Sequence, residues 1–113
     1  MLVYVIRQPR PRVLLLMNLF RDQLDRYGEL EHLAALWARM VAELPASATP
    51  VLNADDPAIS ALGAGRLGVM TFGIDDPSVA LAALPHAADS TRCRVCAHPL
   101  TYDLVTLGHL GHW

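Results

Sequence analysis

The chain has 113 residues, of which 53% are hydrophobic, and a formal net charge of −2 at pH 7. This length and composition suit one modest domain with a packed core and argue against a disordered chain. The small negative charge predicts no binding to nucleic acid or to an acidic lipid surface. All nine cationic side chains are arginines. The chain therefore supplies no lysine for Schiff-base catalysis or for a phosphate-binding P-loop.

The N-terminal segment MLVYVI runs directly into RQPRPR. It has neither the long apolar core nor the small-residue cleavage site of a secretion signal. The next apolar run, VLLLMNLF, is too short to cross a bilayer. We therefore expect a soluble, cytoplasmic protein with no transmembrane segment.

The first predicted strand and helix follow this segment. Residues 13–17 are a continuous apolar run, which predicts a strand buried on both faces of a parallel sheet. The polar segment NLFRDQLDRYGE comes next. Apolar residues then recur every three or four positions over residues 30–44, which predicts a helix that ends at Pro45.

A second strand and helix are predicted after a Pro-containing loop. Residues 50–53 predict a short strand, and Asp55 or Asp56 is expected to cap the helix that follows it. Pro57 suits the first turn of that helix. The glycines at residues 63–65 are expected to end it.

The same order occurs a third time. Residues 67–72 predict a strand, and the sequence GIDDP then repeats the capping pattern before an Ala/Leu-rich helix that runs to Leu84. This alternation predicts the α/β class, with an open, mostly parallel sheet and flanking helices.

Polar clusters directly follow each predicted strand, at residues 18–25, 53–56 and 73–76. Ligands of open α/β sheets bind at the carboxyl ends of the strands, so these clusters are candidates for a binding site. The alternative is that Asp-Asp-Pro only starts a helix. The sequence leaves both interpretations open.

The C-terminal part has a different pattern, with a predicted β-ribbon over residues 100–107. Cys93 and Cys96 form a Cys-x-x-Cys pair, which favours metal or redox chemistry over a disulfide framework. Twelve residues separate Cys96 from His109, and two separate His109 from His112.

Three interpretations of the cysteine pair are open. Cys93, Cys96, His109 and His112 could close a stand-alone zinc-binding interaction module, although finger histidines lie on a helix and these lie among glycines. A thioredoxin-like redox pair would need a helix after it. The pattern best suits one knuckle of a zinc ribbon whose second knuckle would lie beyond residue 113.

Three segments together resemble the MurT family, the Mur-ligase-like subunits of bacterial lipid II isoglutaminyl synthases. They are NLFRDQLDRYGE, VLNADDP and DSTRCRVCAHPLTYDLVTLGHLGHW, and the resemblance runs from about Pro11 to Trp113. It implies that residues 1–87 are part of a nucleotide-binding Mur ligase middle domain. It further implies that residues 88–113 are the first half of a zinc ribbon.

The resemblance implies an ATP-dependent carbon–nitrogen ligase of peptidoglycan biosynthesis. Members of the family amidate the α-carboxyl of D-glutamate in lipid II to D-isoglutamine, using ammonia that a GatD glutaminase partner releases. Phosphorylation makes a carboxylate oxygen a leaving group, and Mg²⁺ helps to stabilise the transferring group. ATP, Mg²⁺ and structural Zn²⁺ are the implied cofactors.

The family's functional residues map onto few positions here. Asn53 matches the asparagine directed at adenine, Asp75 resembles the acidic residue near the ribose, and Cys93 and Cys96 match half of the zinc ribbon. Gln23 replaces a histidine that helps to hold Mg²⁺ in ordinary Mur ligases. The family's lysine-containing phosphate loop and its C-terminal domain have no counterpart in these residues, so we expect the chain alone to be inactive, with no catalytic residue of its own.

Overall fold

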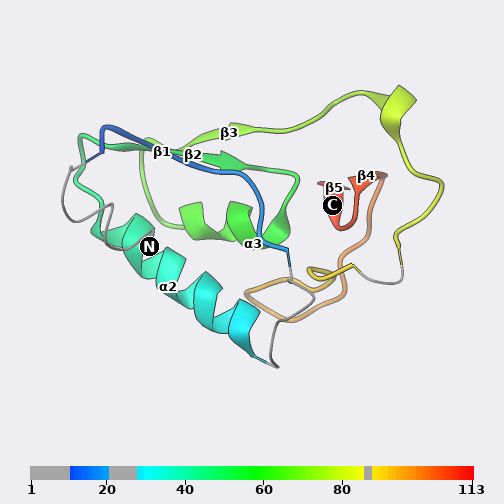
Figure 1. The fold of residues 1–113 in the computed structure, drawn as a ribbon, viewed down its shortest axis with the longest axis horizontal. Helices are drawn as coiled ribbons and strands as arrows, with labels where there is room; N and C mark the ends of the chain where they lie inside the picture. Colours follow the sequence, from blue (N-terminus) through cyan, green and yellow to red (C-terminus); the bar gives the residue numbers. More distant parts are fainter. Residues whose placement is uncertain (1–10, 21–27, 86–87) are drawn as a thin grey trace.

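The computed structural model describes residues 11–20, 28–85 and 88–113. Its centre is a parallel sheet in the order β1-β2-β3, made by β1 (Val13–Leu16), β2 (Thr49–Asn53) and β3 (Met70–Phe72). The helices α2 (Glu29–Glu43) and α3 (Pro57–Ser60) lie on one side of this sheet (Figure 1). The predicted α/β class with a parallel sheet is confirmed.

The hydrophobic core lies between the sheet and these helices. It consists of buried residues from both layers: Leu14, Leu16, Leu19, Leu30, Val41, Leu44, Ala48, Leu52, Ala58 and Ile59. Within the described ranges, no helix is long and apolar enough to span a bilayer.

The strand β1 was predicted correctly, but its predicted burial on both faces was wrong. Leu14 and Leu16 are buried toward the helices, whereas Val13 and Leu15 are 60% and 53% exposed. Successive side chains of a strand point to opposite faces. Met70 pairs with Val51 on the same face as Leu15 and is also exposed. No described element covers that face, which is the physical reason for the difference.

The helix α2 follows the predicted range closely. Leu30, Met40 and Val41 are its buried positions, and the helix ends just before Leu44 and Pro45. The last carbonyls of a helix lack partners within it, and the last turn of α2 contains no basic residue.

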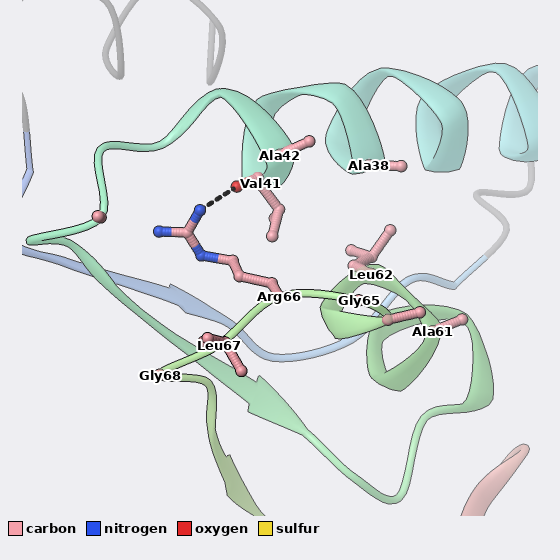
Figure 2. Close-up of a pocket in the computed structure, with 11 residues that line it drawn as sticks. Ala38, Val41, Ala42, Ala61, Leu62, Gly65, Arg66, Leu67 and Gly68 are labelled. Carbon is pink, nitrogen blue, oxygen red and sulfur yellow. Dashed lines mark hydrogen bonds between the residues drawn. The ribbon is translucent and has the colours of Figure 1, made fainter.

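Arg66, from the loop before β3, donates to carbonyls in the last turn of α2 and directly after it. Its guanidinium donates hydrogen bonds to the carbonyl oxygens of Val41, Leu44, Pro45 and Ala48 at 2.9 to 3.2 Å. Figure 2 shows the side chain reaching from its loop toward the end of α2, across a groove of about 650 Å³ that small side chains line. A cation at this position also suits the negative end of the helix dipole. Arg66 therefore fastens the end of α2 to the loop before β3.

Asp56 is the residue that caps α3. Its Oδ1 accepts hydrogen bonds from the backbone N–H groups of Ala58 and Ile59, and Pro57 occupies the first turn as predicted. The α-helix is one turn long and continues as a 3-10 turn, η1 (Ala61–Gly63). The chain then leaves this turn at residues 64–65, close to the predicted stop.

The predicted helix to Leu84 is wrong. Asp76 caps only a 3-10 turn, η2 (Pro77–Val79), and accepts a hydrogen bond from the N–H of Ser78 at 2.9 Å. Val79 and Leu81 are 48% and 43% exposed. A short helix is stable mainly when its apolar face packs against neighbouring elements. Residues 77–83 are all exposed, so this segment lacks such packing.

The C-terminal part contains an antiparallel hairpin of β4 (Leu104–Leu107) and β5 (Leu110–His112). The predicted ribbon over residues 100–107 is thus strand only from Leu104 onward. Gly108 adopts a φ of 59° in the connecting turn, a conformation that suits glycine. The hairpin lies beside the end of the sheet to which β2 points (Figure 1).

Candidate functional site

A cleft of about 540 Å³ opens at the carboxyl ends of β2 and β3. Most of its lining comes from three segments: the turn after β2, the end of β3 with the loop that follows it, and the end of β5 with Trp113. Asp55, Phe72, Asp75, His112 and Trp113 are among the lining residues. The volume falls in the range of small-molecule sites. The structure thus brings the predicted clusters 53–56 and 73–76 together, while residues 21–25 of the third cluster lie outside the described residues.

Asp55 joins the three segments at the base of the cleft. Its Oδ2 accepts a hydrogen bond from the N–H of Ile74 at 2.8 Å, and its backbone carbonyl accepts one from the N–H of Gly111 at 3.0 Å. Gly73 packs so closely against the Asp55 carboxylate that a side chain there would collide with it. Asp55 is 4% exposed, so its carboxylate serves the architecture of the cleft.

Asn53 lies at the end of β2 and is 7% exposed. Its Oδ1 accepts a hydrogen bond from the N–H of Asp55 at 3.0 Å, which is an Asx turn. The side chain is not among those lining the cleft. Its contact with an adenine ring stays a prediction.

Asp75 lines the cleft and is exposed to solvent. It follows β3, and the family resemblance implies a carboxylate near the ribose at this position. A carboxylate is an acceptor of hydrogen bonds from hydroxyl groups. The location is compatible with that role, which stays a prediction.

His112 and Trp113 form one wall of the cleft, and no motif in the sequence pointed to Trp113. The Nε2–H of His112 donates to the carbonyl of Ile74 at 3.0 Å, and the indole N–H of Trp113 donates to the carbonyl of Ala54 at 3.0 Å. These bonds connect residues 38 and 59 positions apart. Contacts over such separations have no local sequence pattern.

A buried polar cluster lies behind the cleft. The carboxylate of Asp56 is 3.4 Å from Nε2 of His109, and both side chains are fully buried. Asp56 Oδ2 also accepts a hydrogen bond from the N–H of Leu19 at 2.7 Å, and the ring of Phe20 lies 4.6 Å from the His109 ring, centroid to centroid. Asp56 therefore connects the end of β1, the start of α3 and the hairpin turn.

Tyr102 extends this cluster toward the cysteines. Its hydroxyl lies 2.9 Å from the carbonyl oxygen of Ser90 and 3.0 Å from that of His109, so these two acceptors share its proton. Burial, and secondly the negative charge of Asp56, raise the pKa of Tyr102 to about 12. The hydroxyl is therefore a neutral donor at physiological pH.

Cys93 and Cys96 lie on a tight turn and are both free thiols. The N–H of Ala97 donates to the Cys93 carbonyl at 2.9 Å, and the N–H of Val95 lies 3.4 Å from Cys93 Sγ. Three hydrogen bonds lower the pKa of the Cys93 thiol. The largest effect comes from the backbone of Cys96, followed by the backbone of Val95 and the side chain of Cys96. Two cysteines on one turn have the arrangement of a zinc knuckle, and their role as metal ligands stays a prediction.

The alternative four-ligand module with His109 and His112 is not assembled in the described structure. His109 is buried against Asp56, and His112 contacts the carbonyl of Ile74. The described part of the chain contains no group of three or more His, Cys, Asp or Glu side chains placed to hold a metal. The hairpin turn directs His109 into the core, which the spacing of the residues does not reveal.

Comparisons with known proteins give consistent matches. Residues 4–111 match the family model of the Mur ligase middle domain. The MurT subunit of lipid II isoglutaminyl synthase (glutamine-hydrolyzing) from Staphylococcus aureus (strain COL) is 27% identical over 109 residues, which cover 96% of this chain and 24% of that protein. The chain therefore spans about a quarter of the length of this relative.

Two D-glutamate ligases are also similar. The UDP-N-acetylmuramoylalanine--D-glutamate ligase of Nitrosomonas eutropha is 33% identical over 82 residues, which cover 71% of this chain and 17% of the ligase. The ligase of that name from Pelotomaculum thermopropionicum is 43% identical over 56 residues, 50% of this chain and 12% of the ligase.

Proposed function

This chain belongs to the Mur ligase family as a middle domain, and from that premise we propose that it is part of an ATP-dependent carbon–nitrogen ligase of peptidoglycan biosynthesis. The reaction we propose is that of a lipid II isoglutaminyl synthase. The α-carboxyl of D-glutamate in lipid II is the acceptor, and a GatD-like glutamine amidotransferase subunit supplies ammonia. The product is D-isoglutamine.

The observation that carries the proposal is the extent of the MurT match. It covers 96% of the chain and so includes Cys93 and Cys96. The matches to the two D-glutamate ligases cover 71% and 50%. The resemblance of the segment around these cysteines to the zinc ribbon of the MurT family supports the same assignment.

The cleft at the ends of β2 and β3 is the proposed nucleotide site. Its residues suit the nucleoside part of ATP, because Asp75 can accept hydrogen bonds from ribose hydroxyls and Phe72 and Trp113 offer apolar surface. None of the described residues that line it is an arginine. The phosphates and Mg²⁺ therefore need groups from other segments.

The chemistry requires an activated carboxyl group. Bound ATP would supply the phosphoryl group that turns a carboxylate oxygen into a leaving group, and ammonia then displaces inorganic phosphate to form the amide. In this scheme the chain's own contribution is to bind and orient the nucleoside end through Asp75 and Asn53, which lie after β3 and at the end of β2. We expect no ligase activity from these 113 residues alone.

Cys93 and Cys96 are proposed as two ligands of a structural Zn²⁺. Their turn places two free cysteines in one knuckle. Tetrahedral zinc requires two further ligands, which we expect from a second knuckle. Zinc bound in this way would rigidify the turn that carries the two cysteines.

The test is an assay of the full-length protein that contains these residues. The protein and a GatD-like subunit are incubated with ATP, glutamine and lipid II, and the product is analysed by mass spectrometry. Conversion of the D-glutamate carboxyl to an amide supports the proposal. Ligation of D-glutamate to UDP-N-acetylmuramoylalanine instead would replace it with the function named for the other relatives.

A further inference from the structure

We infer that Trp113 is a ligand-contacting residue of the cleft and that its indole ring stacks on the base of a bound nucleoside. This inference rests on the proposed nucleotide site. It assigns a ligand contact to the wall of the cleft that follows β5. The ligand class is the uncharged nucleoside part of a nucleotide.

The end of the hairpin is fixed against the sheet by three successive residues. The N–H of Gly111 donates to the carbonyl of Asp55, the Nε2–H of His112 to that of Ile74, and the indole N–H of Trp113 to that of Ala54, each at 3.0 Å. The acceptors lie in the turn after β2 and in the loop after β3. The wall is therefore held at both strand ends that form the cleft.

The indole is anchored but not buried. Trp113 is 46% exposed and lines the cleft while its only polar atom is already paired with Ala54. An indole whose N–H is occupied offers its apolar face, and successive bases stack on such faces in nucleic-acid-binding proteins. Phe72, 38% exposed, lines the same cleft and adds a second aromatic ring.

The charges around the cleft define which part of a nucleotide it accepts. Asp55 and Asp75 are the ionisable side chains that the described lining contains besides His112. Two carboxylates repel phosphate groups and accept hydrogen bonds from hydroxyls. Because the phosphates gain nothing from these carboxylates, the cleft should bind adenosine at least as well as it binds ATP.

The chain's two tryptophans allow a direct test. Trp37 lies on α2 and packs against the core, away from the cleft. In a Trp37→Phe variant, Trp113 is the only tryptophan emitter, and in a Trp113→Phe variant only Trp37 emits. Adenosine is titrated into each variant while emission is recorded, and the Kd is measured separately by calorimetry.

Adenosine should change the emission of the Trp37→Phe variant and leave that of the Trp113→Phe variant unchanged. Trp113→Ala should weaken adenosine binding about tenfold, within the range for loss of base stacking, whereas Trp113→Phe keeps a ring and should lose less. Circular dichroism checks that each variant is folded. If Trp113→Ala unfolds, the emission comparison between the two phenylalanine variants still decides.

Two results would overturn the inference, and they differ in what else they affect. Adenosine binding with the same Kd in Trp113→Ala and no emission change in Trp37→Phe would remove Trp113 from the site and leave the proposed nucleotide site intact. Absence of adenosine and ATP binding to the folded chain in calorimetry would reject the nucleotide site itself.

Discussion

The carboxylate of Asp56 lies 3.4 Å from Nε2 of His109, and neither side chain is exposed to solvent. This pair connects the start of α3, directly after β2, to the turn of a hairpin more than fifty positions later. The same carboxylate accepts backbone hydrogen bonds from Leu19, Ala58 and Ile59. Asp56 is thus the point at which sheet, helix and hairpin are joined.

Replacing Asp56 should destabilise the chain strongly. Asp56→Ala removes a helix cap and leaves buried N–H groups without an acceptor, a loss of about 3 kcal/mol in the free energy of unfolding. Asp56→Asn retains one carbonyl oxygen and should cost less. Urea unfolding followed by circular dichroism measures both.

Asp76 provides the matched control, because it caps η2 within the same Asp-Asp-Pro sequence at the surface. Asp76→Ala should change the urea midpoint much less than Asp56→Ala. Equal losses from the two substitutions would show that capping alone, and not the buried junction, determines the effect of Asp56.

Removing Arg66 should loosen the end of α2. Arg66→Met deletes four hydrogen bonds to backbone carbonyls. Bonds to a charged donor of this kind predict a loss of about 2 kcal/mol in the free energy of unfolding. Arg39→Met, an exposed change on α2, should have little effect. A similar loss for both variants in urea unfolding would count against the role assigned to Arg66.

Tyr102 should make stability fall at alkaline pH. Its pKa is raised from 10.0 in an ordinary tyrosine to about 12 in the fold, by burial and by the charge of Asp56. A raised pKa in the folded state contributes stability that is complete below pH 10 and is lost as the pH rises toward 12. Thermal unfolding between pH 8 and 12 should therefore show a declining Tm.

Tyr102→Phe is the control for this pH dependence. The chain contains no lysine, so tyrosines dominate titration in this interval. The variant should be less stable at neutral pH, because it lacks the hydroxyl that contacts Ser90 and His109, but its Tm should decline less between pH 10 and 12. Parallel declines in the two proteins would refute the assignment to Tyr102.

Zinc binding should depend on the cysteines and not on His112. Cys93→Ser should abolish the weak Zn²⁺ affinity that two thiolates provide, because it removes one of the two ligands. His112→Gln should leave the affinity unchanged, since His112 contacts the carbonyl of Ile74 instead. Competition with a chromophoric chelator measures both. Loss of Zn²⁺ affinity in His112→Gln would instead support the alternative zinc site that includes the histidines.

Local patterns predicted the parts of the fold that local forces determine. The apolar run before Asn18, the helical spacing up to Leu44 and the Asp-Pro cap at Asp56 all correspond to elements at or near the predicted positions. The segment after Asp76 has the same cap but remains a 3-10 turn. Its alanines and leucines favour a helix, yet tertiary packing decides whether one forms.

The candidate site was only partly predictable. The rule that ligands bind at strand ends placed Asn53 and Asp75 near one another, and the cleft opens there. The wall made by His112 and Trp113 depends on hydrogen bonds across 38 and 59 positions, which leave no trace in spacing or composition. His109 was weighed as a metal ligand because spacing records the order of residues and not the direction of a side chain.

The most direct test of the central claim is an NMR titration of the ¹⁵N-labelled chain with adenosine. The indole N–H resonances of Trp37 and Trp113 report on α2 and on the cleft respectively. We predict that adenosine shifts the Trp113 indole and the backbone amides of Ile74 and Asp75 while the Trp37 indole stays in place. Shifts confined to residues away from the ends of β2 and β3, or none at saturating adenosine, would contradict a nucleoside site in this cleft.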